Sequence, residues 1–201
     1  MGLFRNLFGN KKSVENSFIL TKTSQMLDED LYWQIINDSI LNSNTQEEQQ
    51  NYLTKRLQTL SPSEIIGFKL LTDKLLFESY NSELWCAGYI INQGCSDDSF
   101  EYFRQWIISR GKDVFYKAKS NPDSLITEIS EDIDYYDFES LNIIPDEAFE
   151  AKTSKEIYDY IDEVGFDEIV GKYPEIKFNW EEENPQSMQI ICPKLYEKMM
   201  K

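Results

Sequence analysis

The sequence predicts a mainly α, single compact multi-helix domain with a buried central helix and minor or no β-structure. Three observations favour this fold class. Helix-capping residues recur ahead of apolar residues spaced for one helical face, alternating strand patterns are short and few, and one segment is apolar on every side of a helix. The 201 residues, of which 41% are hydrophobic and 14% aromatic, suffice to bury one sizeable core.

Three helix starts lie in the first half of the chain. Asp28 is an N-cap residue, whose side-chain oxygen can accept a hydrogen bond from a backbone N–H. Thr45 with Glu48 and Ser61 with Glu64 form two capping boxes, and the second has a proline at the first helical position. The apolar residues behind these starts are Leu31, Tyr32, Ile35, Ile36 and Ile40, then Leu53, Leu57 and Leu60, then Ile65, Phe68, Leu71, Leu75 and Leu76.

The buried central helix is expected at Leu84–Ile91, because its residues are apolar all round a helical wheel. Gly88 within it permits close packing, and Gly94 suits the left-handed position that ends a helix. Ser96 can cap the next helix, which runs to about Ser109.

A further capping pair, Thr153 with Glu156, predicts a helix in the C-terminal part. The apolar residues that continue it are Ile157, Tyr160, Ile161 and Val164. Gly165 is expected to end this helix.

Charge divides the chain into two parts. Residues 1–25 carry a net charge of +3 and form a basic appendage, whereas residues 26–201 form the helical domain, whose acidic C-terminal part (128–201) carries −13. The appendage has an amphipathic stretch with apolar Leu3, Phe4, Leu7 and Phe8. Such a segment suits a membrane surface, a partner groove or the protein's own domain.

Composition excludes several classes of protein. The absence of histidine removes Ser-His-Asp and Cys-His catalysis, histidine-ligated metals and a histidine pH switch. Three cysteines are an odd number for a disulfide scaffold, so we expect a cytoplasmic protein. No apolar run reaches the ~18 residues of a membrane-spanning helix, so no stable membrane insertion is expected. No phosphate-binding glycine loop or nucleophile elbow is present.

The net charge of −16 bears on partners. Such a charge repels nucleic-acid phosphates, because nucleic-acid binding needs clustered Lys and Arg. It favours solubility, or a basic protein partner that is attracted by long-range steering.

The polar residues of the helix after Ser96 are the candidate site. On a helical wheel, Asp97, Glu101, Arg104 and Ile108 fall within about 60° of one another, along the margin of the apolar face, and Asp98 points further away. This stripe could bind a metal ion, position a water or grip a partner. The structural alternative is that the aspartates complement the helix dipole and that Glu101 and Arg104 form an ordinary i,i+3 pair.

Two other features have both a functional and a structural interpretation. Acidic residues between 128 and 139 surround Tyr135, Tyr136 and Phe138. This pattern is consistent with a surface that receives a basic protein or mimics nucleic acid, or with a solvated loop whose aromatics turn inward. Cys86 and Cys95 are expected to be inert core thiols.

The stretch from Gly94 to Gly111 resembles the hallmark of a bacterial family, domain of unknown function 4240. The matching residues are Gly94-Cys95-Ser96-Asp97-Asp98-Ser99-Phe100 and Phe103-Arg104-Gln105-Trp106-Ile107-Ile108-Ser109-Arg110-Gly111. Asp28-Glu29-Asp30-Leu31-Tyr32-Trp33, Leu60-Ser61-Pro62-Ser63-Glu64-Ile65-Ile66, Asn121-Pro122-Asp123-Ser124-Leu125 and Cys192-Pro193-Lys194-Leu195-Tyr196 match as well. The resemblance spans about 26–198 and implies a bacterial, cytosolic, mostly helical domain without an established activity. It nominates Asp97, Asp98, Arg104, Trp106 and Arg110 as family-typical positions.

These observations favour a non-catalytic protein-binding module, of immunity or adaptor type, that needs no cofactor or metal. The candidate binding site consists of Asp97, Asp98, Glu101, Arg104, Trp106 and Arg110. The alternative is a metal-dependent hydrolase that uses Asp97, Asp98 and Glu101 with a divalent ion. The binding and hydrolase interpretations can be distinguished by whether these carboxylates converge on a concave pocket.

Overall fold

The computed structural model describes residues 20–130 and 132–200, and in these ranges the chain is a mainly α single domain, as predicted. Besides its helices, the described part has only two isolated bridge pairs and no longer strand. The helices are α1 (Glu29–Leu41), α2 (Gln46–Leu57), α3 (Pro62–Glu78), α4 (Ser82–Asn92), α5 (Asp97–Ser109), α6 (Lys112–Ser120), η1 (Pro122–Thr127), α7 (Ser140–Thr153), η2 (Ile157–Tyr160), α8 (Glu163–Val170), α9 (Pro185–Ile191) and α10 (Pro193–Met199).

The three predicted helix starts are confirmed. The Asp28 carboxylate accepts from the Leu31 N–H at 3.0 Å and begins α1. Ser61 and Glu64 form the complete reciprocal capping box of α3. At α2 the Thr45 hydroxyl accepts from the Glu48 N–H. The Glu48 carboxylate, however, accepts from the N–H of Asn44, so α2 does not have the reciprocal capping box seen at α3.

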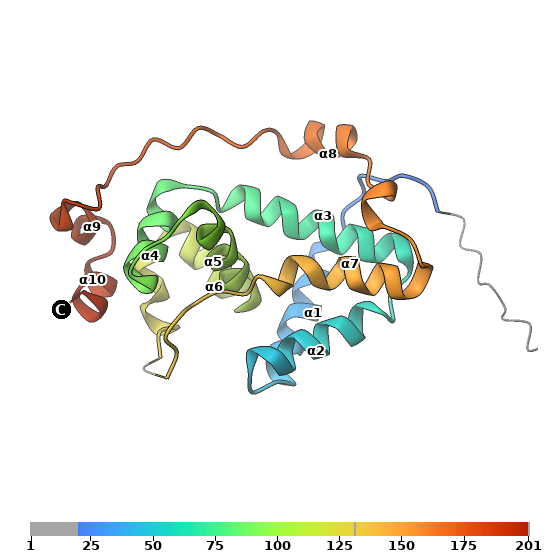
Figure 1. The fold of residues 1–201 in the computed structure, drawn as a ribbon, viewed down its shortest axis with the longest axis horizontal. Coiled ribbons are helices and arrows are strands. Elements are labelled where there is room, and N and C mark those ends of the chain that lie inside the picture. Colours follow the sequence, from blue (N-terminus) through green and yellow to red (C-terminus); the bar gives the residue numbers. More distant parts are fainter. Residues whose placement is uncertain (1–19, 131, 201) are drawn as a thin grey trace, which may run out of the picture.

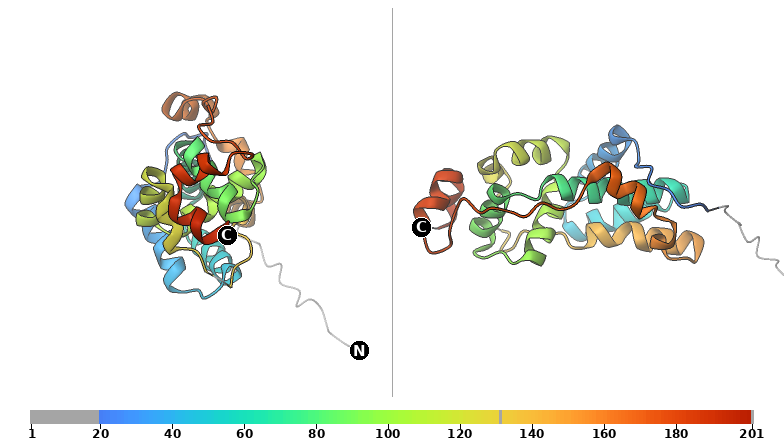
Figure 2. Two further views of the ribbon diagram at one scale, coloured as in Figure 1. Left: turned by 90° about the vertical axis from the view of Figure 1, so that its left-hand side faces the viewer. Right: turned by 90° about the horizontal axis from the view of Figure 1, so that it is seen from above.

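The helices form an elongated body with two ends (Figure 1). At one end α7 packs along both α2 and α3, and α1 packs against the same two helices. At the other end α4, α5, α6 and η1 lie together, and α9 and α10 cover α4 (Figure 2). Because α3 and α5 are in contact, one continuous apolar core joins the two ends.

The central helix α4 is buried as predicted. Ile90 and Cys86 are fully inaccessible, whereas Tyr89 is half-buried. A Cβ added at Gly88 would lie 3.0 Å from the ring of Phe103, so this glycine permits the close approach of α5.

The end of α4 differs from the prediction. Gln93, not Gly94, takes the left-handed conformation, with φ 55° and ψ 39°. Gly94 follows with φ 140°, which only glycine adopts without strain. Both residues are needed because the chain reverses within a few residues to place Ser96 at the start of α5.

The predicted helix from Thr153 to Gly165 is wrong. Thr153 ends α7 instead, and its hydroxyl donates to the carbonyl oxygen of Phe149 at 2.8 Å. The backbone of Thr23 bonds to Tyr160 and Asp162 and pairs with Ile161, which is extended, so α8 begins only after that pairing. Gly165 lies inside α8, where a Cβ would come within 2.8 Å of the Ser24 hydroxyl.

After α8 an extended segment runs along the body to α9 and α10 (Figures 1 and 2). Trp180 anchors its far end, since the indole donates to the Ser82 carbonyl oxygen at 2.9 Å and the side chain is buried. The amphipathic stretch predicted near the N-terminus lies outside the described residues. In the described ranges, no helix has both the length and the apolar character needed to cross a bilayer.

Candidate functional site

The six candidate residues lie on α5 or directly after it, but the fold distributes them over four environments. Asp97 and Asp98 occupy the first turn of α5, where both are exposed. The Ser96 hydroxyl caps this turn by accepting from the Ser99 N–H at 3.3 Å. The two carboxylates therefore lie where negative charge complements the helix dipole.

Arg104 lies in the core and is only 3% exposed. Its guanidinium donates to the carbonyl oxygens of Phe100 and Leu76 and lies over the rings of Phe100 and Tyr80, at 4.6 and 5.1 Å. Burial lowers the pKa of Arg104, while Tyr173 and Glu101 act in the opposite direction. The contacts of Arg104 are those of a structural residue that joins α5 to α3.

Glu101 lines a separate cavity of about 490 Å³ beneath α8. Asp73 contributes a second carboxylate to this cavity, and burial raises the pKa of Asp73. That carboxylate is already paired, because the Lys69 ammonium donates to both of its oxygens at 2.8 and 2.9 Å and to Asn142 at 2.9 Å. The paired carboxylate belongs to the packing of α3 against α7.

The three carboxylates of the hydrolase alternative therefore do not converge. Asp97 and Asp98 face solvent, and Glu101 lies in the cavity beneath α8. In the described part of the chain, no group of three or more Cys, Asp or Glu side chains is arranged to hold a metal ion. This helix thus offers no site for the proposed divalent ion.

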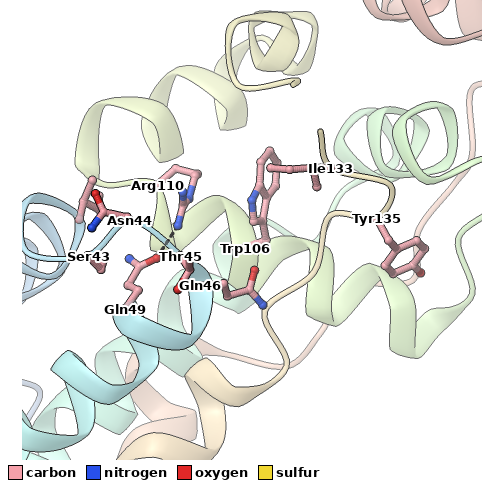
Figure 3. Close-up of a pocket in the computed structure, with 10 residues that line it drawn as sticks. Ser43, Asn44, Thr45, Gln46, Gln49, Trp106, Arg110, Ile133 and Tyr135 are labelled. Atoms are coloured by element: carbon pink, nitrogen blue, oxygen red, sulfur yellow. Dashed lines mark hydrogen bonds between the residues drawn. The ribbon is translucent and has the colours of Figure 1, made fainter. Parts of the chain in front are cut away.

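Trp106 and Arg110, the remaining two candidates, line one cavity of about 320 Å³, here named the α2–α5 pocket (Figure 3). Its other lining residues are Ile40, Ser43, Asn44, Thr45, Gln46, Gln49, Ile133 and Tyr135. The spacing i,i+4 puts Trp106 and Arg110 on the same face of α5. The indole nitrogen lies on the side of the ring that faces Arg110 (Figure 3).

A buried amide fixes the position of Arg110. The Gln49 side chain, 2% exposed, donates to the Ser39 hydroxyl at 3.0 Å and to the Ser109 carbonyl oxygen at 2.9 Å. These two bonds orient the Gln49 carbonyl oxygen so that it accepts from Nη2 of Arg110 (Figure 3). Arg110 Nε also donates to the Ser109 hydroxyl at 3.2 Å.

The electrostatic setting of Arg110 differs from that of a surface arginine. Burial lowers the pKa of Arg110, and the more distant Glu128 carboxylate opposes this effect. Within the described ranges, no carboxylate lies within 4 Å of the guanidinium. Arg110 is thus a partly desolvated cation that has no paired anion among residues 20–130 and 132–200.

The loop before α7 forms one side of the pocket mouth. Some of its aromatic side chains are exposed, as in a docking surface, and others turn inward. Tyr136 and Phe138 are buried, whereas Tyr135 is 44% exposed and Ile133 is 45% exposed. Tyr136 holds the loop in place through Asn92, which accepts from its N–H at 2.9 Å and donates to its carbonyl oxygen at 3.1 Å.

Sequence reasoning missed Gln49 and the turn between α1 and α2 that forms the opposite wall. One signal was present for Gln49: it precedes Leu53 and Leu57 by four and eight residues, so it shares their buried helical face. A glutamine on such a face needs hydrogen-bond partners inside the protein.

The sequence model of the family described as "Protein of unknown function (DUF4240)" matches residues 27–151. The matched range contains α1 to α6, all of α7 except its last two residues, and the residues named above as the lining of the α2–α5 pocket. Comparisons with curated proteins and with solved structures found no match.

Proposed function

The chain belongs to the DUF4240 family, and from that premise we propose that it is a non-catalytic protein-binding module whose partner is a basic protein. In this proposal the α2–α5 pocket and the loop at its mouth form the docking surface. The role is that of an adaptor or an immunity-type protein in the bacterial cytoplasm, in keeping with three free cysteines.

The observation that carries the proposal is the pocket mouth. Exposed Ile133 and Tyr135 alternate there with exposed Asp132 and Asp134, on a loop that buried Tyr136 holds in place. Apolar and aromatic groups supply contact area in a docking surface, and charges around them select the partner. A held loop also loses little conformational entropy when a partner binds.

Charge indicates the kind of partner. The chain carries −16 overall, and the loop at the pocket mouth is acidic. Such a field accelerates the approach of a positively charged protein and repels a negatively charged one.

The chemistry of the pocket supports binding rather than catalysis. Of the residues that the structure describes, the lining includes the Ser43 and Thr45 hydroxyls but no carboxylate that could deprotonate them. The Thr45 hydroxyl already caps α2, and Arg110 stays protonated at ordinary pH. A general base and an activated nucleophile are therefore both missing from this lining.

A charge-reversal experiment tests the function. The full chain serves as bait in an extract of its own cells, and the variant Asp132→Lys/Asp134→Lys is compared with Glu168→Lys/Glu183→Lys. The control pair is also exposed and changes the net charge equally, but it lies outside the pocket. Circular dichroism verifies that both variants are folded.

The wild type and the control are expected to retain the same basic protein, with chemical cross-links to the loop 132–135. The Asp132/Asp134 variant is expected to lose it. Equal retention by both variants, or retention of acidic proteins only, would contradict the proposal.

A further inference from the structure

The lining of the α2–α5 pocket includes one cation, and acidic residues are the sequence neighbours of the residues at its mouth. Arg110 is the cation, Asp132 and Asp134 flank the mouth residue Ile133, and Glu128 is near enough to influence Arg110. We infer that the pocket binds a carboxylate group that is flanked by Lys or Arg residues of the partner. This inference rests on the proposed function and adds the chemistry of the group that enters the pocket.

Unused hydrogen-bond donors face the pocket. A guanidinium has five N–H donors, and the Arg110 bonds to Gln49 and Ser109 involve Nη2 and Nε. Nη1 of Arg110 and the indole N–H of Trp106 have no acceptor among the described residues. A ligand that offers two acceptor oxygens meets both donors.

The pocket is preorganised for such a ligand. Gln49 is itself fixed by Ser39 and by the end of α5, so the Arg110 side chain is already oriented before a ligand binds. A donor that is held in place costs less conformational entropy on binding than a mobile surface side chain.

A carboxylate fits better than a phosphate. A carboxylate offers one oxygen to Nη1 of Arg110 and a second to the indole N–H of Trp106, and its single negative charge balances the single arginine. A phosphate group carries about −1.5 to −2 charges near neutral pH. The described lining residues include no second lysine or arginine to neutralise it, and the residues of the neighbouring loop 128–139 that carry charge are acidic.

The charges at the mouth specify what surrounds the carboxylate. A free organic acid pairs with Arg110 but is repelled by Asp132, Asp134 and Glu128, whereas a carboxylate between basic residues pairs with Arg110 and also offers cations to these acidic residues. Two sources supply this chemistry: the C-terminus of a basic chain, or an Asp or Glu side chain within a basic segment.

Three fluorescein-labelled peptides of sequence Lys-Gly-Lys-Leu-Lys-Gly-Leu distinguish these sources. One has a free C-terminal acid, one a C-terminal amide, and one is an amide with the central Leu replaced by Glu. Fluorescence anisotropy measures their binding to the full chain, to Arg110→Gln, to Trp106→Phe and to the matched control Arg56→Gln, which changes an arginine away from the pocket.

The wild type and Arg56→Gln are expected to bind the acid peptide, the Glu peptide or both at least ten-fold more tightly than the plain amide. Arg110→Gln should abolish that preference, and Trp106→Phe, which keeps a ring but lacks the N–H, should reduce it several-fold. Sodium acetate should compete at an ionic strength at which phosphate does not.

Equal binding of all three peptides by the wild type, or no binding of any, would overturn the carboxylate inference. The proposed function is judged separately by the charge reversal at Asp132 and Asp134. A partner that depends on this loop but is indifferent to Arg110→Gln would leave the proposed function standing and the carboxylate inference refuted.

Discussion

The guanidinium of Arg104 donates from Nη1 to the main-chain carbonyl oxygen of Leu76 and thereby joins α5 to the last turn of α3. Carbonyl groups in the last turn of a helix have no partner within the helix. The same guanidinium donates to Phe100 and lies over its ring. A charged side chain on the most family-like segment is therefore used to hold two helices together.

Replacing Arg104 tests this structural role. Arg104→Ala should lower the free energy of unfolding by about 2–4 kcal/mol, because it removes charge-assisted hydrogen bonds and a packed side chain from the core. Asp97→Asn, at the exposed first residue of the same helix, should cost less than about 0.5 kcal/mol. Urea denaturation followed by circular dichroism measures both values. Similar losses for the two variants would argue against the division of α5 into a buried and a solvent-facing part.

The burial of α4 gives a second test, with an isoleucine elsewhere as its control. Ile90 is fully buried in α4, whereas Ile190 is 79% exposed in α9. Ile90→Ala should lower the free energy of unfolding by about 2–5 kcal/mol, since it deletes core methyl groups and leaves a cavity. Ile190→Ala should stay within about 0.5 kcal/mol of the wild type in the same urea titration. A small loss at Ile90 would mean that α4 is not the packed centre of the domain.

The parts of the fold that sequence predicted are those that neighbouring residues determine. Ser61 and Glu64 are three residues apart and bond to one another, so the start of α3 is a local property. The path after α7 depends on Thr23, some 140 residues upstream, because that residue's backbone bonds to Tyr160 and Asp162 and pairs with the extended Ile161. No pattern within the C-terminal part reveals such a pairing.

In the candidate site, too, the features set by one helix could be predicted, and those set by distant residues could not. The spacing of Trp106 and Arg110 indicates a shared helical face, and the helical wheel also predicts the Asp97–Glu101–Arg104 stripe. A wheel gives angles on one helix but not what the other helices cover. Because α3 covers Arg104 and leaves Asp97 in solvent, the stripe falls into separate environments. Arg110 pairs with Gln49, which lies about 60 residues earlier in the chain, and no pattern on a single helix can predict such a pairing.

Asp146 gives a prediction on the pH dependence of stability. Its Oδ2 accepts from the Tyr158 hydroxyl at 3.1 Å, but its buried Oδ1 has no partner among the described residues. Burial raises the pKa of Asp146 above its usual value, and the nearby Lys69 only partly offsets this. The folded state therefore holds this proton more tightly than the unfolded state does.

The sign of the effect follows from that difference. An acid whose pKa is raised on folding makes the protein less stable as pH rises through the interval between the unfolded and folded pKa values. The loss is complete above the folded pKa and vanishes below the unfolded one. Asp146→Asn should therefore raise the Tm at pH 7, with a difference that shrinks toward pH 4. The exposed control Asp159→Asn should show no such pH dependence in the same thermal scans. A lower Tm for Asp146→Asn at pH 7 would contradict the prediction.

The cysteines provide the last prediction. Burial raises the pKa of Cys95 to about 12, and the Arg104 charge offsets only part of this. The pKa of Cys192 is also raised, first by a hydrogen bond with Cys86 and then by burial. Cys86 and Cys192 are both buried as free thiols. Since the thiolate is the reactive form, the folded protein should resist alkylation.

At pH 8 the Cys95 thiolate should be roughly a thousand-fold scarcer than that of an ordinary cysteine with a pKa near 8.5. Iodoacetamide labelling followed by mass spectrometry should therefore modify all three cysteines in urea and none of them in the native protein over the same time. Ser120→Cys, which adds a thiol at an exposed position, serves as the reference for a reactive cysteine in the folded state. Labelling of Cys95 at the rate of that reference would show that its thiol is open to solvent, and that the packing of Gly88 against this region is looser than its close contacts indicate.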